Sequence, residues 1–509
     1  MNKGIIILDF GSQYNQLIGR RIREMEVYSE ILPFNTSLEV LKSKNPAGII
    51  LSGGPSSVNS PDAHLLEKEI FELGIPILGI CYGMQLTAHL LGGNVKKGVK
   101  GEYGKATLEI IKENALFKDV PENSTVWMSH FDEVETLPQD FEISAKSGVI
   151  AGIFNQNKNI YCVQFHPEVS HTEFGAKMLE NFVFGICNAE KNWKLTNYIE
   201  KTVAEIKEKV GDSKVILGLS GGVDSSVAAV LIHKAIGSQL QCIFVDTGLL
   251  RKDEGKKVME QYGNHFHMNI DMVDASDRFL GKLKGISDPE EKRKIIGNEF
   301  VAVFDEESHK FEGAQFLAQG TIYPDVIESQ SVKGPSAVIK SHHNVGGLPE
   351  EMNLQLLEPL RELFKDEVRK VGVELGIPHH MVYRHPFPGP GLGIRILGEV
   401  DVEKVRILQE ADNIFIEELY KNDLYEKVSQ AFVVLLPVKS VGVMGDERTY
   451  EYTAVVRSAD TIDFMTATFS RFSWEFLEMI SNRIINEVRG INRVTYDISS
   501  KPPATIEWE

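Results

Sequence analysis

Three residues in the N-terminal third of the chain have the types and spacing of a cysteine-dependent hydrolytic site. Cys81 directly follows the apolar run Ile75–Ile80, and its G-I-C-Y-G setting has the form of a nucleophile elbow with sulfur in place of oxygen. A helix that begins behind this cysteine lowers the thiol pKa and favours the thiolate. His166 and Glu168 are two residues apart in a predicted extended segment, so both side chains point to the same side. Because Glu168 can orient His166 and His166 can take the Cys81 proton, we prefer a nucleophile to a small core cysteine.

Such a nucleophile also needs backbone N–H groups that stabilise the oxyanion of the tetrahedral intermediate. The N–H of Tyr82, directly after the cysteine, is one candidate. A second candidate is the N–H of Gly54, in the Gly-Gly-Pro turn that follows the apolar segment Gly48–Leu51. We therefore expect Gly54 and Tyr82 to form the oxyanion hole.

A second stretch, SGGVDSS, has the composition of a phosphate-binding turn. A predicted buried strand precedes it and a predicted apolar helix follows, so unpaired backbone N–H groups and the helix dipole form an anion site. The usual nucleotide loop carries a lysine here, whereas this chain carries Asp224, which suits a Mg²⁺ ion that bridges the phosphates. Asp246 follows the next predicted strand. Two roles stay open for it: a contact with ATP or a cap of the following helix. The expected ATP-binding residues are Ser220, Gly221, Gly222, Val223, Asp224, Ser225, Ser226 and Asp246.

The composition limits the classes of partner. The chain has 509 residues, 42% of them hydrophobic and 25% charged, with a net charge of −18, so we expect no nucleic-acid partner. None of its four cysteines forms a C-x-x-C pair, which argues against a zinc or redox site and suits a reducing cytoplasm. Asp9 interrupts the first apolar run, and no long apolar segment follows it, so we expect neither a signal peptide nor a membrane partner.

The elements that must position these residues alternate between strand and helix. The pattern predicts strands over 4–10, 48–51, 75–80 and 161–165, helices over 13–26 and 63–73, and then helix 196–210 and strand 240–245. After residue 384 it predicts helix 402–419, strands 430–438 and 452–457, helix 469–488 and strand 491–498. We expect an α/β protein with two doubly wound parallel-sheet domains followed by a small α+β domain.

Three domains follow from these elements: residues 1–190, 191–383 and 384–509. Gly185–Lys194 is the expected linker, and the Pro/Gly-rich stretch Arg384–Glu399, which ends in a predicted apolar strand, is the second boundary. Residues 318–329 are expected to end a strand in a loop that holds Asp325 and Glu328. The basic run Lys292–Lys294 has the ordinary interpretation of a solvated helix face.

Several of these motifs resemble known families. SGGVDSS is similar to the pyrophosphate loop of ATP pyrophosphatases, which cleave ATP between the α- and β-phosphates to adenylylate an acceptor. Residues 1–190 resemble a class I glutamine amidotransferase in the strings SGGPSS, GICYGMQ, MSHFDEV and QFHPEV. That resemblance implies that Cys81 is the nucleophile, His166 the base and Glu168 its orienter. It also implies that Gln85 and His130 help to hold glutamine, and the family often has glycine where this chain has Phe131.

Nearly the whole chain resembles the glutamine-hydrolysing GMP synthetase family. The motifs, in order, are GICYGMQ, HPEV, SGGVDSS, GTIYPDVIES, KSHHNVGG, RHPFPGPGLGIRILGE and KPPATIEWE. The resemblance implies a carbon–nitrogen ligase of purine biosynthesis that converts XMP, ATP and glutamine to GMP, AMP, pyrophosphate and glutamate. ATP adenylylates the C2 oxygen of XMP, and ammonia from glutamine displaces AMP. The implied cofactor is Mg²⁺ bound with ATP, with Asp224 as its protein ligand.

The same resemblance implies further site residues. The expected XMP contacts are Arg293, Lys501, Ile506 and Glu507. Independently of the resemblance, the polar stretch Ile339–Pro349 has Gly346 and Gly347 after a charged patch and suits a mobile lid. The expected lid residues are Lys340, His342, His343 and Asn344. The C-terminal domain is expected to form a homodimer. Ile506, Trp508 and two prolines argue that the tail is docked, and the tail has the alternative role of only packing that domain.

Three alternatives remain at this point. A related ATP pyrophosphatase amidates another acceptor such as deamido-NAD, but NAD synthetases lack the closing KPPATIEWE module. A non-enzymatic sensor is disfavoured by the intact triad and phosphate loop. An RNA-thiolating enzyme would need paired cysteines and a basic surface, and this chain has neither.

Overall fold

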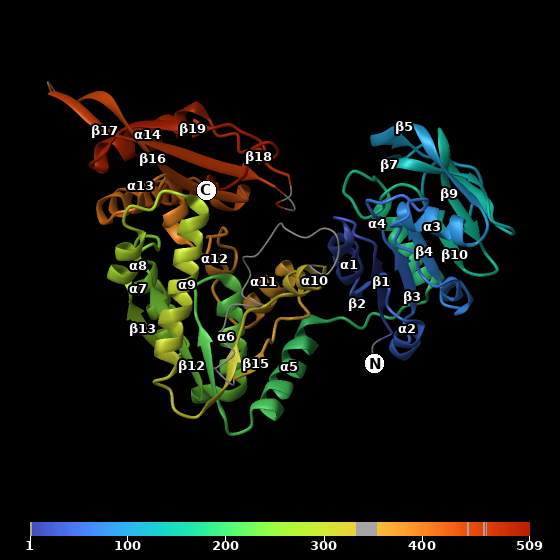
Figure 1. Ribbon diagram of the computed structural model, residues 1–509, viewed down its shortest axis with the longest axis horizontal. Helices are drawn as coiled ribbons and strands as arrows, with labels where there is room; N and C mark the ends of the chain where they lie inside the picture. The colour runs from blue at the N-terminus through green and yellow to red at the C-terminus, as the bar shows by residue number, and fades with distance from the viewer. Residues whose placement is uncertain (1–2, 332–353, 445–446, 462–463, 465) are drawn as a thin grey trace. The chain divides into compact units, whose positions relative to one another are not determined.

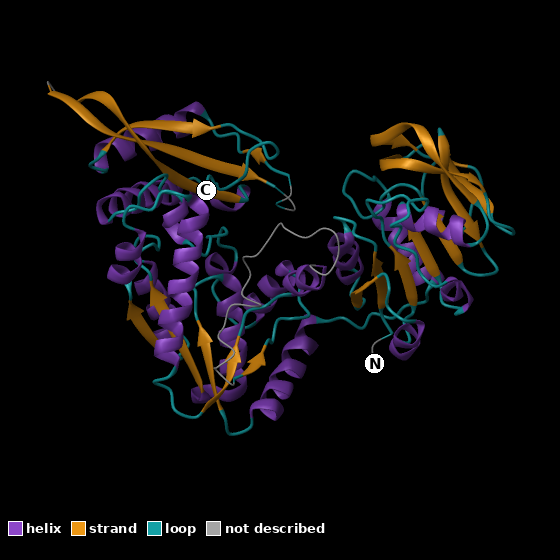
Figure 2. Cartoon of the chain, in the orientation of Figure 1, coloured by secondary structure: helices purple, strands orange, loops and turns teal. Residues whose placement is uncertain are grey.

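The computed structural model describes residues 3–331, 354–444, 447–461, 464 and 466–509 (Figure 1). The described residues form two compact units, one made mainly of residues 3–198 and the other mainly of residues 199–326 and 354–509. Both combine helices with strands, as Figure 2 shows. In the part of the chain that the structure describes, no helix is long and apolar enough to cross a membrane.

The first unit is built on an eight-stranded sheet in the order β2-β1-β3-β4-β10-β9-β8-β6. The five strands from β2 to β10 in this order are parallel, and the remaining three join antiparallel. The strands are β1 (Ile5–Asp9), β2 (Ser29–Pro33), β3 (Gly48–Leu51), β4 (Ile77–Ile80), β6 (Glu109–Ile110), β8 (Glu142–Ser147), β9 (Val149–Asn155) and β10 (Ile160–Val163). The helices are α1 (Asn15–Glu24), α2 (Leu38–Lys44), α3 (Tyr82–Leu90) and α4 (Gly175–Glu180). The continuous apolar strands β3, β4 and β10 are buried throughout, as expected for a parallel sheet covered on both faces.

Two features of this unit differ from the sequence-based expectation. The predicted helix over 63–73 is wrong, since only Lys68–Glu72 form a short 3₁₀ helix. Tertiary contacts hold the preceding segment: the His64 ring stacks on Phe34 with centroids 4.5 Å apart, and its carbonyl accepts the Tyr82 hydroxyl at 3.0 Å. A separate antiparallel pair, β5 (Asn94–Thr107) and β7 (Thr125–Thr136), was not predicted.

The second unit contains a five-stranded parallel sheet in the order β13-β12-β11-β14-β15. These strands are β11 (Lys214–Gly218), β12 (Leu240–Asp246), β13 (Asn269–Asp274), β14 (Ala314–Ala318) and β15 (Gln355–Leu357). The accompanying helices are α5 (Leu195–Val210), α6 (Val223–Ile236), α7 (Glu254–Val258), α8 (Ser276–Leu283), α9 (Pro289–Ser308), α10 (Tyr323–Ser331), α11 (Lys365–Glu374) and α12 (His379–Val382). The order, with β11 in the centre and later strands on both sides, confirms the predicted doubly wound α/β fold.

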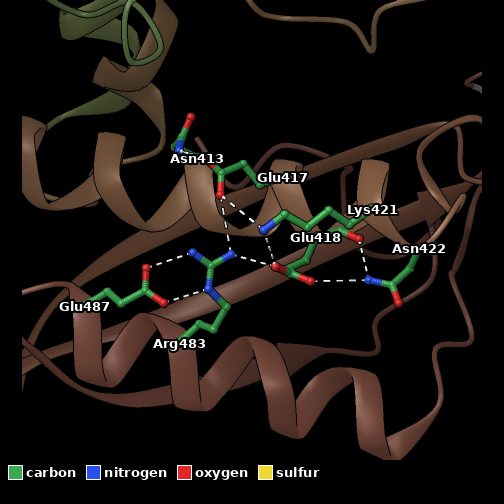
Figure 3. Close-up of polar contacts among 7 residues, drawn as sticks. All are labelled: Asn413, Glu417, Glu418, Lys421, Asn422, Arg483 and Glu487. Atoms are coloured by element: carbon green, nitrogen blue, oxygen red, sulfur yellow. Dashed lines mark hydrogen bonds and ion pairs between the residues drawn. The ribbon is translucent and has the colours of Figure 1, made fainter.

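The C-terminal part of this unit is α+β, as predicted. Strands β16 (Gln430–Met444), β17 (Glu447–Asp460), β18 (Thr468–Phe469) and β19 (Ile491–Asp497) form one sheet, and α13 (Val402–Lys421) and α14 (Trp474–Glu487) accompany it. Arg483 of α14 links the two helices, because its guanidinium contacts Glu418 of α13 at 2.6 Å (Figure 3). The same guanidinium also contacts Glu487 of its own helix at 2.6 Å. One buried apolar cluster includes residues from both sheets, from Ile216 to Ile491. The division into three domains therefore stays a prediction.

Three local expectations in this unit were wrong. The loop expected to hold Asp325 and Glu328 is the helix α10. The apolar strand expected at the end of 384–399 is a 3₁₀ turn over Gly391–Ile394 with a single bridge from Ile396 to Leu435. Helix α14 begins at Trp474 rather than at residue 469, because the Ser473 side chain accepts the Phe476 N–H and caps it.

Candidate active sites

Cys81 occupies a strained turn between β4 and α3. Its φ of 53° and ψ of −105° are unusual for a residue with a side chain and are the kind of strain found at functional sites. The turn is tight, since a Cβ on Gly83 would lie 2.3 Å from the Leu51 carbonyl oxygen. The Cys81 N–H also donates to Val163 of β10 at 2.8 Å. The sequence G-I-C-Y-G thus forms an elbow that fixes the thiol at the carboxyl end of the sheet.

His166 and Glu168 follow β10, the strand next to β4, so the parallel sheet brings both to the same edge as Cys81 (Figure 1). The His166 Nδ1–H donates to Glu168 Oε1 at 2.7 Å, and both side chains are buried. The His166 carbonyl accepts the Thr172 hydroxyl at 2.6 Å, which helps to hold the backbone at this position. The structure therefore places all three predicted triad residues together, with Glu168 orienting the imidazole.

The electrostatics favour an imidazolium at His166. Burial alone lowers the His166 pKa, but the Glu168 carboxylate and a hydrogen bond with Cys81 outweigh it and raise the pKa to about 10. Gln164 Nε2 donates to the Cys81 sulfur at 3.6 Å. Burial raises the pKa of the Cys162 and Cys242 thiols to about 12, so these two stay protonated. Cys81 differs from these two buried thiols in its hydrogen bond with the His166 imidazole, and its role as a nucleophile stays a prediction.

A pocket of about 500 Å³ opens onto Cys81 and His166. Gly54, Gln85 and His130, all expected near the glutamine or the oxyanion, line it. Gln85 Nε2 donates to the Asp132 carbonyl at 2.8 Å, and His130 Nδ1 donates to the same carbonyl at 3.0 Å. These two side chains therefore position the β7 backbone as part of the pocket wall.

The two oxyanion candidates flank the nucleophile in different ways. A Cβ on Gly54 would lie 2.8 Å from the Phe10 carbonyl oxygen and 3.3 Å from the Tyr82 ring, so glycine is required for this close approach. The Tyr82 hydroxyl is bound to His64 and its side chain is buried, which leaves the backbone N–H at the start of α3 as its candidate contribution.

Sequence reasoning missed part of the pocket wall. Lys97 and Tyr103 from β5 and Phe131 and Asp132 from β7 also line it. These residues are brought in by the unpredicted β5–β7 pair. The string MSHFDEV was the available signal, since it contains Phe131 and Asp132, but nothing local pointed to β5.

The SGGVDSS stretch is a strand–loop–helix turn, as predicted. Gly221 has a φ of +73°, which favours glycine, and Gly222 is the N-cap residue of α6. The Ser220 and Ser225 hydroxyls lie 2.9 Å apart, and the Gly222 N–H donates to Ser220 Oγ at 3.3 Å. A Cβ on Gly320, after β14, would lie 2.9 Å from the backbone of Asp224, so the adjacent loop packs directly on the first turn of α6. Ser226 and Val223 are both buried.

The charges at this turn come from distant segments. Lys365, the first residue of α11, contacts Asp224 Oδ2 at 2.6 Å. Arg384 donates to the Gly221 carbonyl at 2.6 Å and pairs with Glu254 at 2.5 Å. Sequence reasoning named neither cation for this loop, because sequence spacing carries no information about a contact across more than 100 residues.

Asp246 ends β12, the strand beside β11. Its carboxylate accepts the Gly248 N–H at 2.9 Å, and the next helix, α7, has Asp253 as its N-cap residue. The helix-cap alternative for Asp246 is therefore wrong, although the carboxylate does stabilise a local turn.

The C-terminal tail is docked, as expected from its apolar residues. Glu507 accepts from Arg395 at 2.8 Å and from Gln430 at 2.7 Å, and Ile506 is buried. Lys501 Nζ donates to the Phe464 carbonyl at 2.7 Å. Arg293 donates to the Glu509 backbone oxygen, which brings this α9 residue to the tail.

Lys292 does not belong to a solvated basic face. It is fully buried, with its ammonium 2.5 Å from the Glu509 carboxylate and 2.7 Å from the Ile396 carbonyl. Burial lowers the pKa of Lys292, and Glu509 opposes that shift. Lys292, Arg395 and Gln430 are tail partners that sequence reasoning missed. The expected lid residues Lys340, His342, His343 and Asn344 lie outside the described residues.

The fold and the two sites define a class: a glutamine amidotransferase unit joined to an ATP-pyrophosphatase-like unit. Three family profiles match, described as "Glutamine amidotransferase class-I" over residues 6–186, "NAD synthase" over 194–284 and "GMP synthase C terminal domain" over 417–508. Curated relatives named "GMP synthase [glutamine-hydrolyzing]" include one from Fusobacterium nucleatum, 68% identical over 99% of each chain. Others are from Brachyspira hyodysenteriae, 60% identical, and Aquifex aeolicus, 59% identical, each over 99% of both chains.

This chain belongs to the glutamine-hydrolysing GMP synthase family, and its activity is glutamine-dependent GMP synthesis. The match to the C-terminal GMP synthase profile removes the alternative of a deamido-NAD acceptor. The full-length relatives named GMP synthase remove the alternatives of a non-enzymatic sensor and of an RNA-thiolating enzyme.

Proposed function

We propose that Cys81, His166 and Glu168 release ammonia from glutamine and that the Ser220–Ser226 loop handles the ATP with which the enzyme adenylylates XMP. The assignment divides the chain into residues 1–190 for glutamine hydrolysis, 191–383 for adenylylation and 384–509 for XMP contacts and homodimer formation. The observation that carries it is the Cys81 elbow, with the buried His166–Glu168 hydrogen bond of 2.7 Å beside it.

Glutamine hydrolysis proceeds through an acyl-enzyme. The Cys81 thiolate attacks the amide carbon, and the N–H groups of Tyr82 and Gly54 stabilise the resulting oxyanion. The His166 imidazolium gives its proton to the leaving nitrogen, so ammonia departs as the thioester forms. Neutral His166 then takes a proton from water, the water attacks the thioester, and glutamate is released as the Cys81 sulfur leaves. Glu168 keeps the imidazole oriented in both steps.

Adenylylation uses the phosphate loop. The loop N–H groups and the hydroxyls of Ser220 and Ser225 suit the pyrophosphate oxygens, and Lys365 and Arg384 supply local positive charge. Asp246, at the end of the neighbouring strand, is proposed to contact the nucleoside. The C2 oxygen of XMP attacks the α-phosphorus and pyrophosphate leaves; ammonia then adds at C2 and AMP leaves.

The residues at Asp224 fit a Mg²⁺ ion that accompanies ATP. Asp224 Oδ2 pairs with Lys365, while Oδ1 is buried and has no hydrogen-bond partner among the described residues. No group of three or more potential ligands occurs within those residues, which suits an ion that takes most of its ligands from phosphates and water. When bound, Mg²⁺ neutralises charge on the leaving pyrophosphate.

The acceptor site is proposed to lie at the docked tail. Arg293, Lys501, Ile506 and Glu507 are the proposed XMP contacts, and Lys340, His342, His343 and Asn344 the proposed lid. Support for the tail comes from its fixed position, since Arg395 and Gln430 hold the Glu507 carboxylate. Action in the cytoplasm as a homodimer is part of the same proposal.

The test is Cys81→Ala in the full chain. Glutamine-dependent GMP synthesis should fall by at least about 1000-fold, because no thiolate remains to form the acyl-enzyme. Synthesis from added ammonia should stay within about twofold of the parent enzyme, since adenylylation does not use this thiol. The measurement is GMP formation with glutamine or with ammonium chloride as the nitrogen source.

Cys162→Ala is the matched control, because Cys162 is a buried cysteine of β10 in the same sheet. It should keep glutamine-dependent synthesis within about threefold, since its thiol is protonated and takes no part in the chemistry. If Cys81→Ala abolishes both activities while circular dichroism shows a folded protein, the separation into two sites is wrong.

A further inference from the structure

We propose that the Lys97 ammonium, placed over the Phe131 ring, binds the α-carboxylate of glutamine and selects amino-acid amides over other amides. This inference rests on the proposed role of Cys81. It adds a specificity-determining residue from β5 to a site whose other parts come mainly from the large sheet and from β7.

The strand register puts Lys97 on the pocket side of β5. Lys97 is paired with Asp132 of β7, and its neighbour Lys96 is paired with Glu133. Successive side chains of a strand point to opposite faces. Lys97 and Asp132 line the pocket, whereas Lys96 forms ion pairs with Glu133 at 3.4 Å and with Glu135 at 3.2 Å.

The Lys97 ammonium keeps its hydrogen-bond donors available for a ligand. Within the described part of the chain, Lys97 has no ion pair, and its nearest recorded partner is the Phe131 ring, with Nζ 5.1 Å from the centroid. Lys97 is also the one lysine or arginine among the described residues that line this pocket, and Asp132 is the one aspartate or glutamate. Lys97 and Asp132 are paired across the two strands, so the pocket offers one positive and one negative group to a zwitterionic ligand.

The direction of glutamine in the pocket follows from the chemistry. Its amide carbon must meet Cys81, so its α-carbon, with a carboxylate and an ammonium group, lies at the other end of the molecule. The Asp132 carboxylate, held by the Ser57 hydroxyl, suits the ammonium group, and Lys97 suits the carboxylate as a point charge.

Phe131 explains how a long lysine side chain is held at this place. Phe131 is 39% exposed, although aromatic residues of this size are usually buried, and its ring lies beneath the ammonium at the pocket wall. A cation–π contact restrains Lys97 without consuming its hydrogen-bond donors. A Cβ on Gly101 would lie 3.1 Å from the Phe131 ring, so the β5 backbone also contacts the ring.

The experiment compares Lys97→Met with Lys96→Met in the full-length enzyme. Lys97→Met keeps the length of the side chain and removes the charge. It should raise the KM for glutamine by about tenfold and change kcat by less than about twofold, because a charge-assisted contact to bound substrate is lost. Lys96→Met, which removes the same charge on the opposite face of β5, should leave both constants at the parent values.

An analogue tests the α-carboxylate directly. 4-Aminobutanamide is glutamine without that carboxylate, and its inhibition constant against glutamine hydrolysis should be the same for the parent enzyme and Lys97→Met. Lys97→Arg should restore most of the lost affinity for glutamine, and Phe131→Leu should raise the glutamine KM by about threefold. An unchanged glutamine KM in Lys97→Met overturns the proposal, and so does an inhibition constant that rises by the same factor as the KM.

Failure of this inference is distinguishable from failure of the proposed function. If Cys81→Ala abolishes glutamine use but Lys97→Met does not alter the glutamine KM, only the carboxylate assignment is wrong. If Cys81→Ala still uses glutamine, the hydrolytic site itself is misassigned.

Discussion

The Cys81 site and the phosphate loop are built on the same kind of strand–turn–helix unit, but different groups form the ion pairs within each site. Each lies where a buried parallel strand turns into a helix, at the ends of β4 and β11. At the first site the paired residues are the reacting ones, since His166 and Glu168 are hydrogen-bonded to each other beside Cys81. At the second, Asp224 is paired with Lys365 and Arg384 with Glu254, so the charged groups contact one another.

The difference follows from the chemistry of each site. Acyl transfer needs a nucleophile and a base at a fixed separation before the substrate arrives, so a rigid and buried arrangement is an advantage. A phosphate site must offer charged groups to a ligand that enters and leaves. Asp224 and Lys365 are both partly exposed, with 30% and 43% of their side chains accessible, so their pair can exchange partners. We therefore expect substitutions at the two sites to separate the two activities.

The largest effect should come from Asp224→Asn. Loss of this carboxylate should slow pyrophosphate release from ATP by roughly 1000-fold, because the proposed Mg²⁺ ligand and the partner of Lys365 are both removed. The measurement is XMP-dependent pyrophosphate formation with ammonia as the nitrogen source. Asp277→Asn is the control, because Asp277 and Asp224 occupy the same kind of position, the first turn of a helix (α8 and α6). Asp277 is exposed and lies outside the proposed site. An unchanged rate at limiting Mg²⁺ would count against the metal role.

A smaller effect is expected for Glu168→Gln. Glutamine hydrolysis should fall by roughly 100-fold, because the imidazole loses its orienting partner. Glu168 is the main group that raises the His166 pKa above its ordinary value of 6.5, and burial opposes it. Without the carboxylate the imidazolium loses its proton at lower pH, so the alkaline limit of hydrolysis should move to lower pH. The pH profile of glutamate release measures this, and an unshifted profile would contradict the assigned role.

The same pKa makes a stability prediction with a definite sign. A folded-state pKa of about 10 means that the fold stabilises protonated His166. This contribution is complete below pH 6.5 and is lost as the pH rises toward 10, so the unfolding temperature should fall over that range. The fall should be smaller in Glu168→Gln. Glu180→Gln, an exposed glutamate of the same unit, should behave like the parent.

The smallest effect in this series is expected for Lys501→Ala, which tests the acceptor side of the second site. The KM for XMP should rise by about tenfold, because a charge-assisted contact is lost, while the KM for ATP and the unfolding temperature barely move. Steady-state kinetics and a thermal melt together separate this from a packing role. A lower melting temperature with unaltered XMP affinity would mean that Lys501 acts only through its contact with the Phe464 carbonyl.

Local sequence alone determined the strand–turn–helix units and the residues on them. The apolar runs of β3, β4 and β11 predict buried strands, and the glycines around Cys81 and in SGGVDSS predict tight turns at their ends. These features were predictable because each depends on residues that are neighbours in the chain. The pairing of Cys81 with His166 was predictable as well, because parallel strands carry their following residues to the same edge.

Only the tertiary structure decided which charges meet. Lys365 reaches Asp224, Arg384 reaches Gly221 and Lys292 is buried against Glu509, each across more than 100 residues. Nothing local distinguishes these side chains from solvated lysines and arginines. The position of Lys97 likewise depends on the β5–β7 register, and a shift of one residue would turn it away from the pocket. The physical reason is that chain propensity and apolar pattern act over a few residues, whereas ion pairing and burial depend on what the whole fold brings together.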